Sequence, residues 1–214
     1  KNGLRVLAFA YKKHQNNHIS FEDENHLTFI ALVSLIDPPK EGSYEAVKKC
    51  KEAGIKPIMI TGDHIITAKA IAKTLGIYKK NDLYLEGKEL DHISDYELSK
   101  ILPKISVYAR VTPTHKMRIV KLWQKQGSIV AMSGDGVNDA PALKQSDIGI
   151  AMGKRGSEVC KDAADFILSD DNFSTIIQAV MTGRNVYNHI QNAILYLLSG
   201  NFAGIICVFL ASIL

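Results

Sequence analysis

The chain has 214 residues, of which 22% are charged and 46% hydrophobic, and its formal net charge is +4. That length is enough for one large or two small domains, and the composition is typical of an ordinary globular protein. Because the lysines are scattered and no basic tract alternates with aromatic residues, the sequence predicts no nucleic-acid partner.

Two strands are predicted near the start of the chain. Residues 4–11 form a short apolar run and residues 27–36 a longer one that reads as a buried strand, with a polar, loop-like segment at 14–25 between them. The segment Asp37-Pro38-Pro39-Lys40 then stiffens the chain and lacks two backbone donors. It suits either a hinge between domains or a plain loop between a strand and a helix.

Helices and strands alternate from Ser43 onward. Ser43 is expected to cap a helix that ends at Gly54. A strand at 57–60 leads into Thr61-Gly62-Asp63, and the apolar stripe of the next helix is closed by Gly76. Residues 77–103 interrupt this alternation, and within them Ser94 and Glu97 are expected to form a capping box for a short helix.

The alternation continues to residue 168. A strand at 105–110 precedes a helix with Thr112 as its N-cap, Pro113 at its first position and Gly127 just past its end. Strands at 128–132, 148–152 and 166–168 follow, and Ser157 opens a small helix between the last two. The sequence therefore predicts an α/β fold in which helices cover both faces of a parallel sheet and the strand ends meet at one rim.

The last segment, residues 193–214, contains no charged residue. As a helix it would be roughly 33 Å long at about 1.5 Å per residue, enough to cross a bilayer core of about 30 Å. A buried core helix is the alternative, but such helices rarely lack a polar face over six turns. We expect a helix from Ser174 to continue into a transmembrane span. Since the chain begins without Met and stops at the edge of this span, we also expect it to be part of a longer membrane protein.

Cysteine usage indicates the redox environment. Cys50, Cys160 and Cys207 are far apart in the sequence and show no metal-ligand spacing. We expect free thiols in a reducing compartment, each behaving as a small buried apolar residue.

The segment after strand 128–132 concentrates the chemistry. Asp135, Asn138 and Asp139 lie within five residues and are interleaved with Gly134 and Gly136. A glycine-rich turn at a strand end lets side chains and backbone N–H groups converge on one ligand. Two such carboxylates predict a hard divalent cation, most simply Mg²⁺. A solvated acidic turn is the alternative.

Two further strand ends carry polar groups. Thr61 offers a hydroxyl, and Gly62 an N–H that a phosphate can approach closely, although a plain turn is the alternative. Lys116 lies in the first turn of its helix, where the helix dipole disfavours a cation unless an anion is near; an exposed surface lysine is the alternative. With Arg110 these groups suit phosphoryl transfer, but no residue stands out as the nucleophile.

These segments resemble the P-type ATPases, specifically the calcium-pump branch. The matching segments are 37–40, 61–63, 109–111, 113–116 and 134–143, and residues 170–176 resemble the start of the family's stalk helix. The resemblance covers nearly the whole chain. It implies a haloacid dehalogenase-like, Rossmann-type phosphorylation domain at 37–172, preceded at 1–36 by the end of the nucleotide-binding domain. A stalk helix at 173–192 and the fifth transmembrane helix at 193–214 would follow.

The resemblance also implies residue roles. Asp135 would bind Mg²⁺, while Asn138 and Asp139 would support the phosphate and the surroundings of the metal. Thr61 and Gly62 would hold the phosphoryl group beside Asp63, and Lys116 would neutralise it. Arg110 and Arg5 would contact ATP from the two sides of the hinge. The phosphorylated aspartate, in a DKTGT segment, would lie upstream of Lys1, so this chain alone is expected to be inactive.

Asn201 is the candidate for the transported ion, because polar groups inside a membrane helix are costly; an interhelical hydrogen bond is the alternative. Gly204 stands where two-calcium pumps of this resemblance carry a glutamate, which favours one ion per cycle. The expected function is ATP-driven calcium transport by an integral membrane protein. Its soluble part would be cytoplasmic, and its partners would be the bilayer and the remaining domains and helices of the same pump.

Three alternatives remain open from the sequence. The first is a pump of the same family for Na⁺, K⁺, H⁺ or Mn²⁺. The second is a soluble haloacid dehalogenase-like phosphatase, which predicts an in-chain nucleophilic aspartate and no membrane helix. The third is a non-catalytic, membrane-anchored domain.

Overall fold

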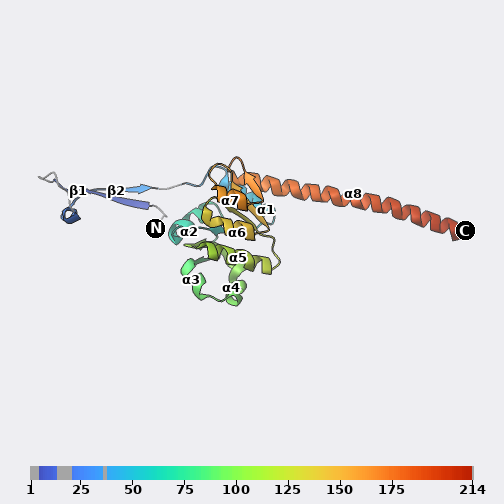
Figure 1. Cartoon of the computed structure of the whole chain (residues 1–214), viewed down its shortest axis with the longest axis horizontal. Helices are drawn as coiled ribbons and strands as arrows, with labels where there is room; N and C mark the ends of the chain where they lie inside the picture. The colour runs from blue at the N-terminus through green and yellow to red at the C-terminus, as the bar shows by residue number, and fades with distance from the viewer. Residues whose placement is uncertain (1–4, 14–20, 36–37, 214) are drawn as a thin grey trace.

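The computed structural model describes residues 5–13, 21–35 and 38–213, which form a hairpin, an α/β body and one long helix (Figure 1). The hairpin consists of β1 (Arg5–Tyr11), the 3-10 helix η1 (Phe21–Glu24) and β2 (Thr28–Leu35). In chain order, the elements of the body are α1 (Ser43–Glu52), β3 (Met59–Ile60), α2 (Ile65–Thr74), β4 (Leu83–Glu86), α3 (Gly87–His92), α4 (Asp95–Ile101), η2 (Leu102–Lys104), β5 (Ile105–Ala109), α5 (Pro113–Lys125), β6 (Ala131–Gly134), η3 (Val137–Asp139), α6 (Ala140–Gln145), β7 (Ile148–Met152), α7 (Glu158–Ala163) and β8 (Phe166–Leu168). The long helix is α8 (Phe173–Ile213).

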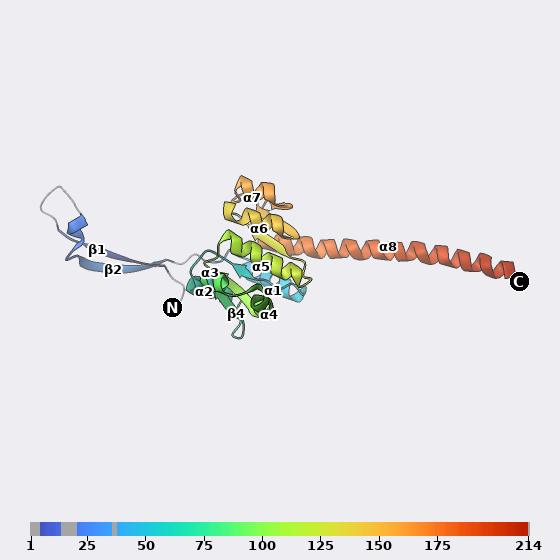
Figure 2. The same ribbon diagram turned by 60° about the horizontal axis from the view of Figure 1, so that its bottom comes forward.

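The β1–β2 hairpin is antiparallel and confirms the two strands predicted near the start. The prediction that the second strand is buried is wrong for its described residues, since Phe29 is 62% and Leu32 63% exposed. Figures 1 and 2 show the reason: the hairpin stands apart from the α/β body, so no helix covers either of its faces. Within the described part of the chain, its large apolar side chains therefore remain about half exposed.

Strand β5 lies at the centre of the core and shows how helices cover both faces of its sheet. Tyr108 packs among residues of α3, α4 and α5, whereas Val107 and Ala109 pack against α2 and Val47 of α1. Successive strand residues point to opposite faces, so one buried strand anchors both helical layers. The prediction of an α/β fold with parallel strands and helices on both faces is confirmed.

The six parallel strands are divided into two three-stranded sheets. Their orders are β3-β5-β4 and β6-β7-β8, and all pairs in them are parallel. Ile60 of β3 packs against the core cluster that contains Met132 of β6. The two sheets are thus joined by side-chain packing rather than by a shared hydrogen-bond ladder, a division that the sequence did not predict.

Several predicted helix ends are confirmed, and one is corrected. The capping boxes at Ser94 and Thr112 are present, and Ser157 accepts a hydrogen bond from the Cys160 N–H. Ser43, however, does not cap α1: it is the first helical residue, and the N-cap is Gly42 with φ +80°. A left-handed backbone suits glycine, and it starts the helix there without a side-chain cap.

The strand leading into the glycine-rich turn begins later than predicted. Strand β6 covers Ala131–Gly134, so Gly134 belongs to the strand rather than to the loop. Before it, the Val130 N–H donates to the Asp147 carboxylate instead of to a neighbouring strand. The Asp147 side chain thus takes the Val130 N–H that would otherwise be available to extend strand β6 toward the N-terminus.

Helix α8 has 41 residues and leaves the body without a break, as predicted. Ile176 and Ile177 are buried against the body, and the Arg184 guanidinium donates to the Ala53 carbonyl oxygen at 2.6 Å. Among the described residues, α8 is the one helix long and apolar enough to cross a membrane, and none of its apolar window is buried. The predicted transmembrane span thus coincides with the exposed part of α8.

The three cysteines are free thiols, as predicted. Cys50 and Cys160 are buried, and burial raises the pKa of the Cys50 thiol. Cys207 is exposed on α8, so the expectation of burial does not hold for it.

Candidate active site

The carboxyl ends of β3 and β5 are tied together through their backbones. The Arg110 N–H donates to the Asp63 carbonyl at 3.1 Å, and the Val111 N–H donates to the Thr61 carbonyl at 3.3 Å. These bonds extend the parallel ladder beyond the strands and place Thr61-Gly62-Asp63 beside Arg110. Two of the predicted strand ends therefore meet, as the topology of a parallel sheet requires.

The Thr61 hydroxyl is already engaged within its own turn. It donates to the Asp63 carboxylate and accepts from the Asp63 N–H, both at 3.1 Å. Such a local pairing fixes the turn and the direction of the hydroxyl. A β-carbon added at Gly62 would meet no atom within 4 Å, so the backbone there borders open space that a ligand can enter.

The glycine-rich turn after β6 is closed by Asp139. Its N–H donates to the Gly136 carbonyl at 2.8 Å, and its carboxylate accepts from the Gly136 N–H at 3.3 Å. A β-carbon on Gly134 would lie 2.4 Å from the Asp139 β-carbon. Gly134 is therefore required so that the Asp139 side chain can fold back over the strand end.

Lys116 joins helix α5 to this turn. Its ammonium group forms an ion pair with the Asp139 carboxylate, and both side chains are only 12% exposed. The position of Lys116 in the first turn of α5 led us to expect an anion nearby, and the Asp139 carboxylate is such an anion. Because removal of one partner would leave a buried, unpaired charge, the two residues depend on each other.

Asp135 differs from Asp139 in being open to solvent. Its backbone carbonyl accepts from the Ser157 N–H at 2.9 Å, but within the described chain its carboxylate has no hydrogen-bond or ion-pair partner. No group of three or more His, Cys, Asp or Glu side chains lies together among the described residues. One free carboxylate fits Mg²⁺, which binds to proteins through one or two carboxylates and completes its coordination with water and phosphate.

The remaining predicted residues are distributed unevenly. Asn138 is exposed on the same turn as Asp135, and Arg110 is exposed at the end of β5. Arg5 begins β1, but its side chain lies outside the described part of the structure, as does Asp37. Asn201 is exposed on α8 in its uncharged segment, away from the strand ends.

The sequence analysis missed the contacts that surround Arg110. His115 is buried and bonds to Asp91, and Gly87 lies against the Arg110 carbonyl. The capping position of His115, as the third residue of a helix with Thr112 as its N-cap, could have been read from the local sequence. Its pairing with Asp91 could not, because no local sequence pattern links residues 24 positions apart.

Comparison with protein families gives the fold group. A haloacid dehalogenase-like hydrolase family model matches residues 7–147, and a second model of the same description matches residues 117–180. The chain belongs to the haloacid dehalogenase-like hydrolases.

This haloacid dehalogenase-like chain is similar over nearly its whole length to calcium-transporting ATPases. It is 53% identical to calcium-transporting ATPase 1 of Lactococcus lactis over 99% of the chain, and 51% identical to that of Bacillus cereus over 100%. It is 47% identical over 99% to the human calcium-transporting ATPase type 2C member 1. The chain spans 24%, 24% and 22% of the lengths of these relatives.

Proposed function

We propose that this chain is one part of an ATP-driven calcium pump that passes through an aspartyl-phosphate. The observation that carries the proposal is the 47–53% identity to calcium-transporting ATPases over 99% of the chain. Because these residues correspond to 24% of the Lactococcus protein, most of the pump would lie outside this chain.

Four parts of the pump would follow one another along the chain. Residues 1–36 would end the nucleotide-binding domain, 37–172 would form most of the phosphorylation domain, and α8 would supply the stalk at 173–192 and a transmembrane helix at 193–214. The exposed apolar faces of the β1–β2 hairpin support the first assignment, since an isolated two-stranded hairpin is marginally stable and needs further strands. The phosphorylation domain would lie in the cytoplasm.

The strand ends would divide the work of phosphoryl transfer. Bound Mg²⁺ neutralises charge on phosphoryl oxygens, and the free carboxylate of Asp135 would hold it. Lys116, kept in place by Asp139, would add positive charge beside the transferred group. Thr61 and Gly62 would position the phosphoryl oxygens, with Asn138 supporting them. Asp63, Arg110 and Arg5 would serve the nucleotide side of the site.

The divided sheet supports an acceptor aspartate outside this chain. Strands β3 and β6 each have one paired edge in the described structure, and Ile60 packs against the cluster around Met132. A strand inserted between them would unite the two sheets into one parallel sheet. An aspartate at its carboxyl end would then lie between the ends of β3 and β6, next to the groups that handle phosphate.

Asn201 would contribute to the path of the ion. Its amide lies in a part of the helix that is free of charge from residue 193 onward. Such groups in a membrane are expensive and usually bind an ion or another helix. Gly204, one turn later, supplies no ligand, which favours a single calcium ion per cycle.

The decisive test uses the complete pump. Asp135→Asn should abolish phosphoenzyme formation from ATP while calcium binding in the membrane persists. Asn201→Ala should raise the calcium concentration needed for phosphorylation while Mg²⁺ dependence stays the same. Unchanged phosphoenzyme formation and turnover in Asp135→Asn would instead support a non-catalytic, membrane-anchored domain.

The complete pump also distinguishes calcium from competing cations, and a transporter from a phosphatase. ATPase activation by Mn²⁺ or Na⁺ but not by micromolar calcium would replace calcium with another cation. Recovery of the protein in the soluble fraction, with phosphatase activity and no ATP-dependent phosphoenzyme, would favour a soluble phosphatase.

A further inference from the structure

Arg110 has an unusual backbone for its residue type. Its φ is +50°, in the left-handed region, where a residue with a β-carbon persists only if its surroundings hold it. Arg110 follows the buried strand β5 directly, and its side chain is exposed at the rim that carries Thr61. The backbone strain therefore lies in the turn that sets the direction of this arginine.

One side of the turn is held by β3. The Arg110 N–H donates to the Asp63 carbonyl and the Val111 N–H to the Thr61 carbonyl, at 3.1 and 3.3 Å. These two bonds fix the peptide groups on either side of the Arg110 α-carbon. Because the C=O of a trans peptide points opposite to its N–H, the Arg110 carbonyl oxygen is directed away from Thr61, toward the other side of the turn.

Helix α3 approaches from that direction. A β-carbon on Gly87, its first residue, would lie 2.2 Å from the Arg110 carbonyl oxygen and 3.3 Å from Cε1 of His115. Strand β4 pairs with β5 up to Glu86 and Ala109, so Gly87 follows directly from the end of that ladder. Glycine is required there because helix and turn are in backbone contact.

His115 connects the end of the turn to the same helix. Its Nδ1 accepts from the Thr112 N–H at 3.2 Å, which assigns the ring proton to Nε2, and Nε2 donates to the Asp91 carboxylate at 2.8 Å. The imidazole is 9% exposed, whereas the Asp91 side chain is 61% exposed. His115 thus bridges the backbone of Thr112 and the side chain of Asp91.

We propose that Gly87, Asp91 and His115 act as positioning residues that hold the Arg110–Thr112 turn so that Arg110 points toward the nucleotide. This inference rests on the role of Arg110 in the proposed function. None of the three touches the reacting atoms; each acts through the backbone of the turn. They provide a support for the nucleotide side of the site that is separate from Lys116 and Asp139, which serve the phosphate.

The test compares nucleotide use with phosphate use in the complete pump. Asp91→Ala should raise KM for ATP roughly three- to ten-fold, the loss expected for one hydrogen bond, with kcat at saturating ATP nearly unchanged. In Asp91→Asn, KM for ATP should stay near the wild-type value, because the amide oxygen can still accept a hydrogen bond from His115 Nε2. Phosphorylation by inorganic phosphate, which involves no nucleotide, should be normal in both. His92→Ala, at an exposed position of the same helix, is the matched control and should leave KM unchanged.

Coupling to Arg110 decides the outcome. Arg110→Ala should raise KM for ATP, and adding Asp91→Ala to it should have little further effect, since both act through one side chain. If Arg110→Ala raises KM but Asp91→Ala and Gly87→Ala do not, the positioning role is refuted and the proposed function stands. If Arg110→Ala leaves KM unchanged, the nucleotide role of Arg110 fails and the inference fails with it. Equal losses with ATP and with inorganic phosphate in Asp91→Ala would mean a merely structural contact and would also overturn it.

Discussion

Gly134 shows how one missing side chain can determine a site. The Asp139 side chain occupies the space that a β-carbon of residue 134 would need. A β-carbon built on Gly134 would lie 2.4 Å from the β-carbon of Asp139. Gly134→Ala should therefore displace Asp139, break its pair with Lys116 and destabilise the body by about 3 kcal/mol, at the upper end of ordinary overpacking. Thermal unfolding of the purified protein would measure the loss.

Gly136 offers the matched control within the same turn. Its φ is −93°, which any residue adopts, and a β-carbon there would lie 3.6 Å from the nearest atom, an Asp139 carboxylate oxygen. Gly136→Ala should unfold at nearly the wild-type temperature. Equal destabilisation by both substitutions would contradict the packing argument.

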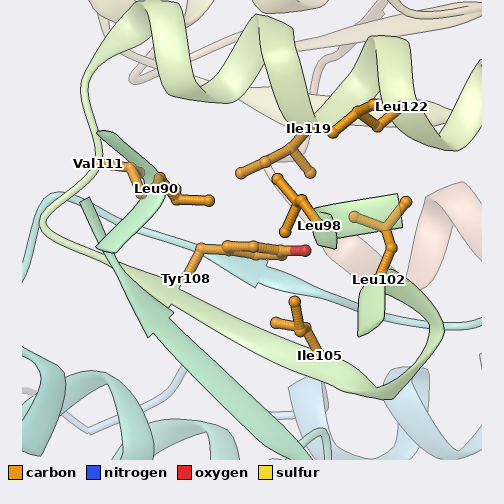
Figure 3. Packing of buried hydrophobic residues seen from close by; sticks show 8 residues of the cluster. All are labelled: Leu90, Leu98, Leu102, Ile105, Tyr108, Val111, Ile119 and Leu122. Carbon is orange, nitrogen blue, oxygen red and sulfur yellow. The ribbon is translucent and has the colours of Figure 1, made fainter. Parts of the chain in front are cut away.

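Tyr108 presents the opposite case, a polar atom without a partner. Figure 3 shows its ring among Leu90, Leu98 and Ile119, and its buried hydroxyl has no hydrogen bond among the described residues. Burial raises the pKa of this hydroxyl, so it stays protonated and pays the cost of lost hydration. Tyr108→Phe should therefore stabilise the protein by about 1 kcal/mol, seen as a higher unfolding temperature.

Tyr84→Phe controls for removal of a hydroxyl as such. Tyr84 is 41% exposed, and its ring lies under the Lys69 ammonium at 3.7 Å, a contact that phenylalanine keeps. Stability should hardly change. A less stable Tyr108→Phe protein would mean that the hydroxyl is satisfied by a buried water.

At the scale of elements, the start of α8 is joined to the body by two aspartates. Asp171 has φ +50° and accepts from the Lys154 and Arg155 N–H groups at 3.0 Å, while Asp170 accepts from the Thr175 hydroxyl at 2.7 Å. Lys40, at the other end of the body's sequence, donates to the Asp171 carbonyl at 3.0 Å. Three distant segments thus meet where the long helix begins.

This junction should weaken in acid. The Lys154 N–H and then the Arg155 N–H hold the pKa of Asp171 below its usual value. A lowered folded-state pKa contributes stability that is complete above about pH 4, the unfolded value, and is lost as the pH falls through the folded value. Asp171→Asn keeps an acceptor and tolerates a left-handed backbone, so it should remove this acid dependence. Amide exchange of residues 153–156 between pH 6 and 3, corrected for intrinsic rates, would measure it.

The exposed Asp162 provides a comparison, because its carboxylate makes no side-chain hydrogen bond in the part of the chain that the structure describes. Asp162→Asn also removes one negative charge. Amide exchange of residues 153–156 should then depend on pH as it does in the wild type. If Asp171→Asn and Asp162→Asn change the acid dependence equally, the cause is the loss of a negative charge in general and not the loss of the Asp171 hydrogen bonds.

Elements with local causes were predictable from the sequence, and those with distant causes were not. The boxes at Ser94 and Thr112, and the left-handed Gly76 and Gly127, were read correctly because each signal lies within four residues of the helix end it sets. Strand β4 and helix α3 were missed because their positions depend on pairing with β5 and on the contact between Gly87 and Arg110.

The candidate site followed the same rule. The strand ends that carry Thr61 and Arg110 could be placed side by side from topology alone, and the backbone bonds between them confirm it. The partner of Lys116 could not be identified, because nothing in the sequence relates it to Asp139 across 23 residues. Likewise, the division into two sheets depends on which strands pair, and the apolar pattern of a strand does not name its neighbour.

For the whole molecule, the orientation of α8 makes a prediction about solvent access. Cys207 is exposed on the uncharged part of the helix. If this part lies in a bilayer among other helices, water is excluded and a water-soluble reagent cannot reach the thiol. In native membranes of the complete protein, a water-soluble maleimide should therefore leave Cys207 unmodified until detergent denaturation.

A cysteine introduced at Gln178, exposed on α8 next to the body, serves as the positive control and should react at once. Rapid modification of Cys207 in intact membranes would place this end of the helix in water and argue against a membrane span.

The unbroken course of α8 also has a mechanical consequence. Its 41 residues extend about 60 Å, at about 1.5 Å per residue, and only the first turns are fastened to the body. A tilt of about 10° at that fastening would shift the far end by about 10 Å, if the helix stays as straight as regular helices do. A change too small to disturb the packing around Ile176 would be amplified several-fold at Asn201. The helix would thus act as a lever that is fastened to the body near Ile176 and Ile177 and carries Asn201 far along its free arm.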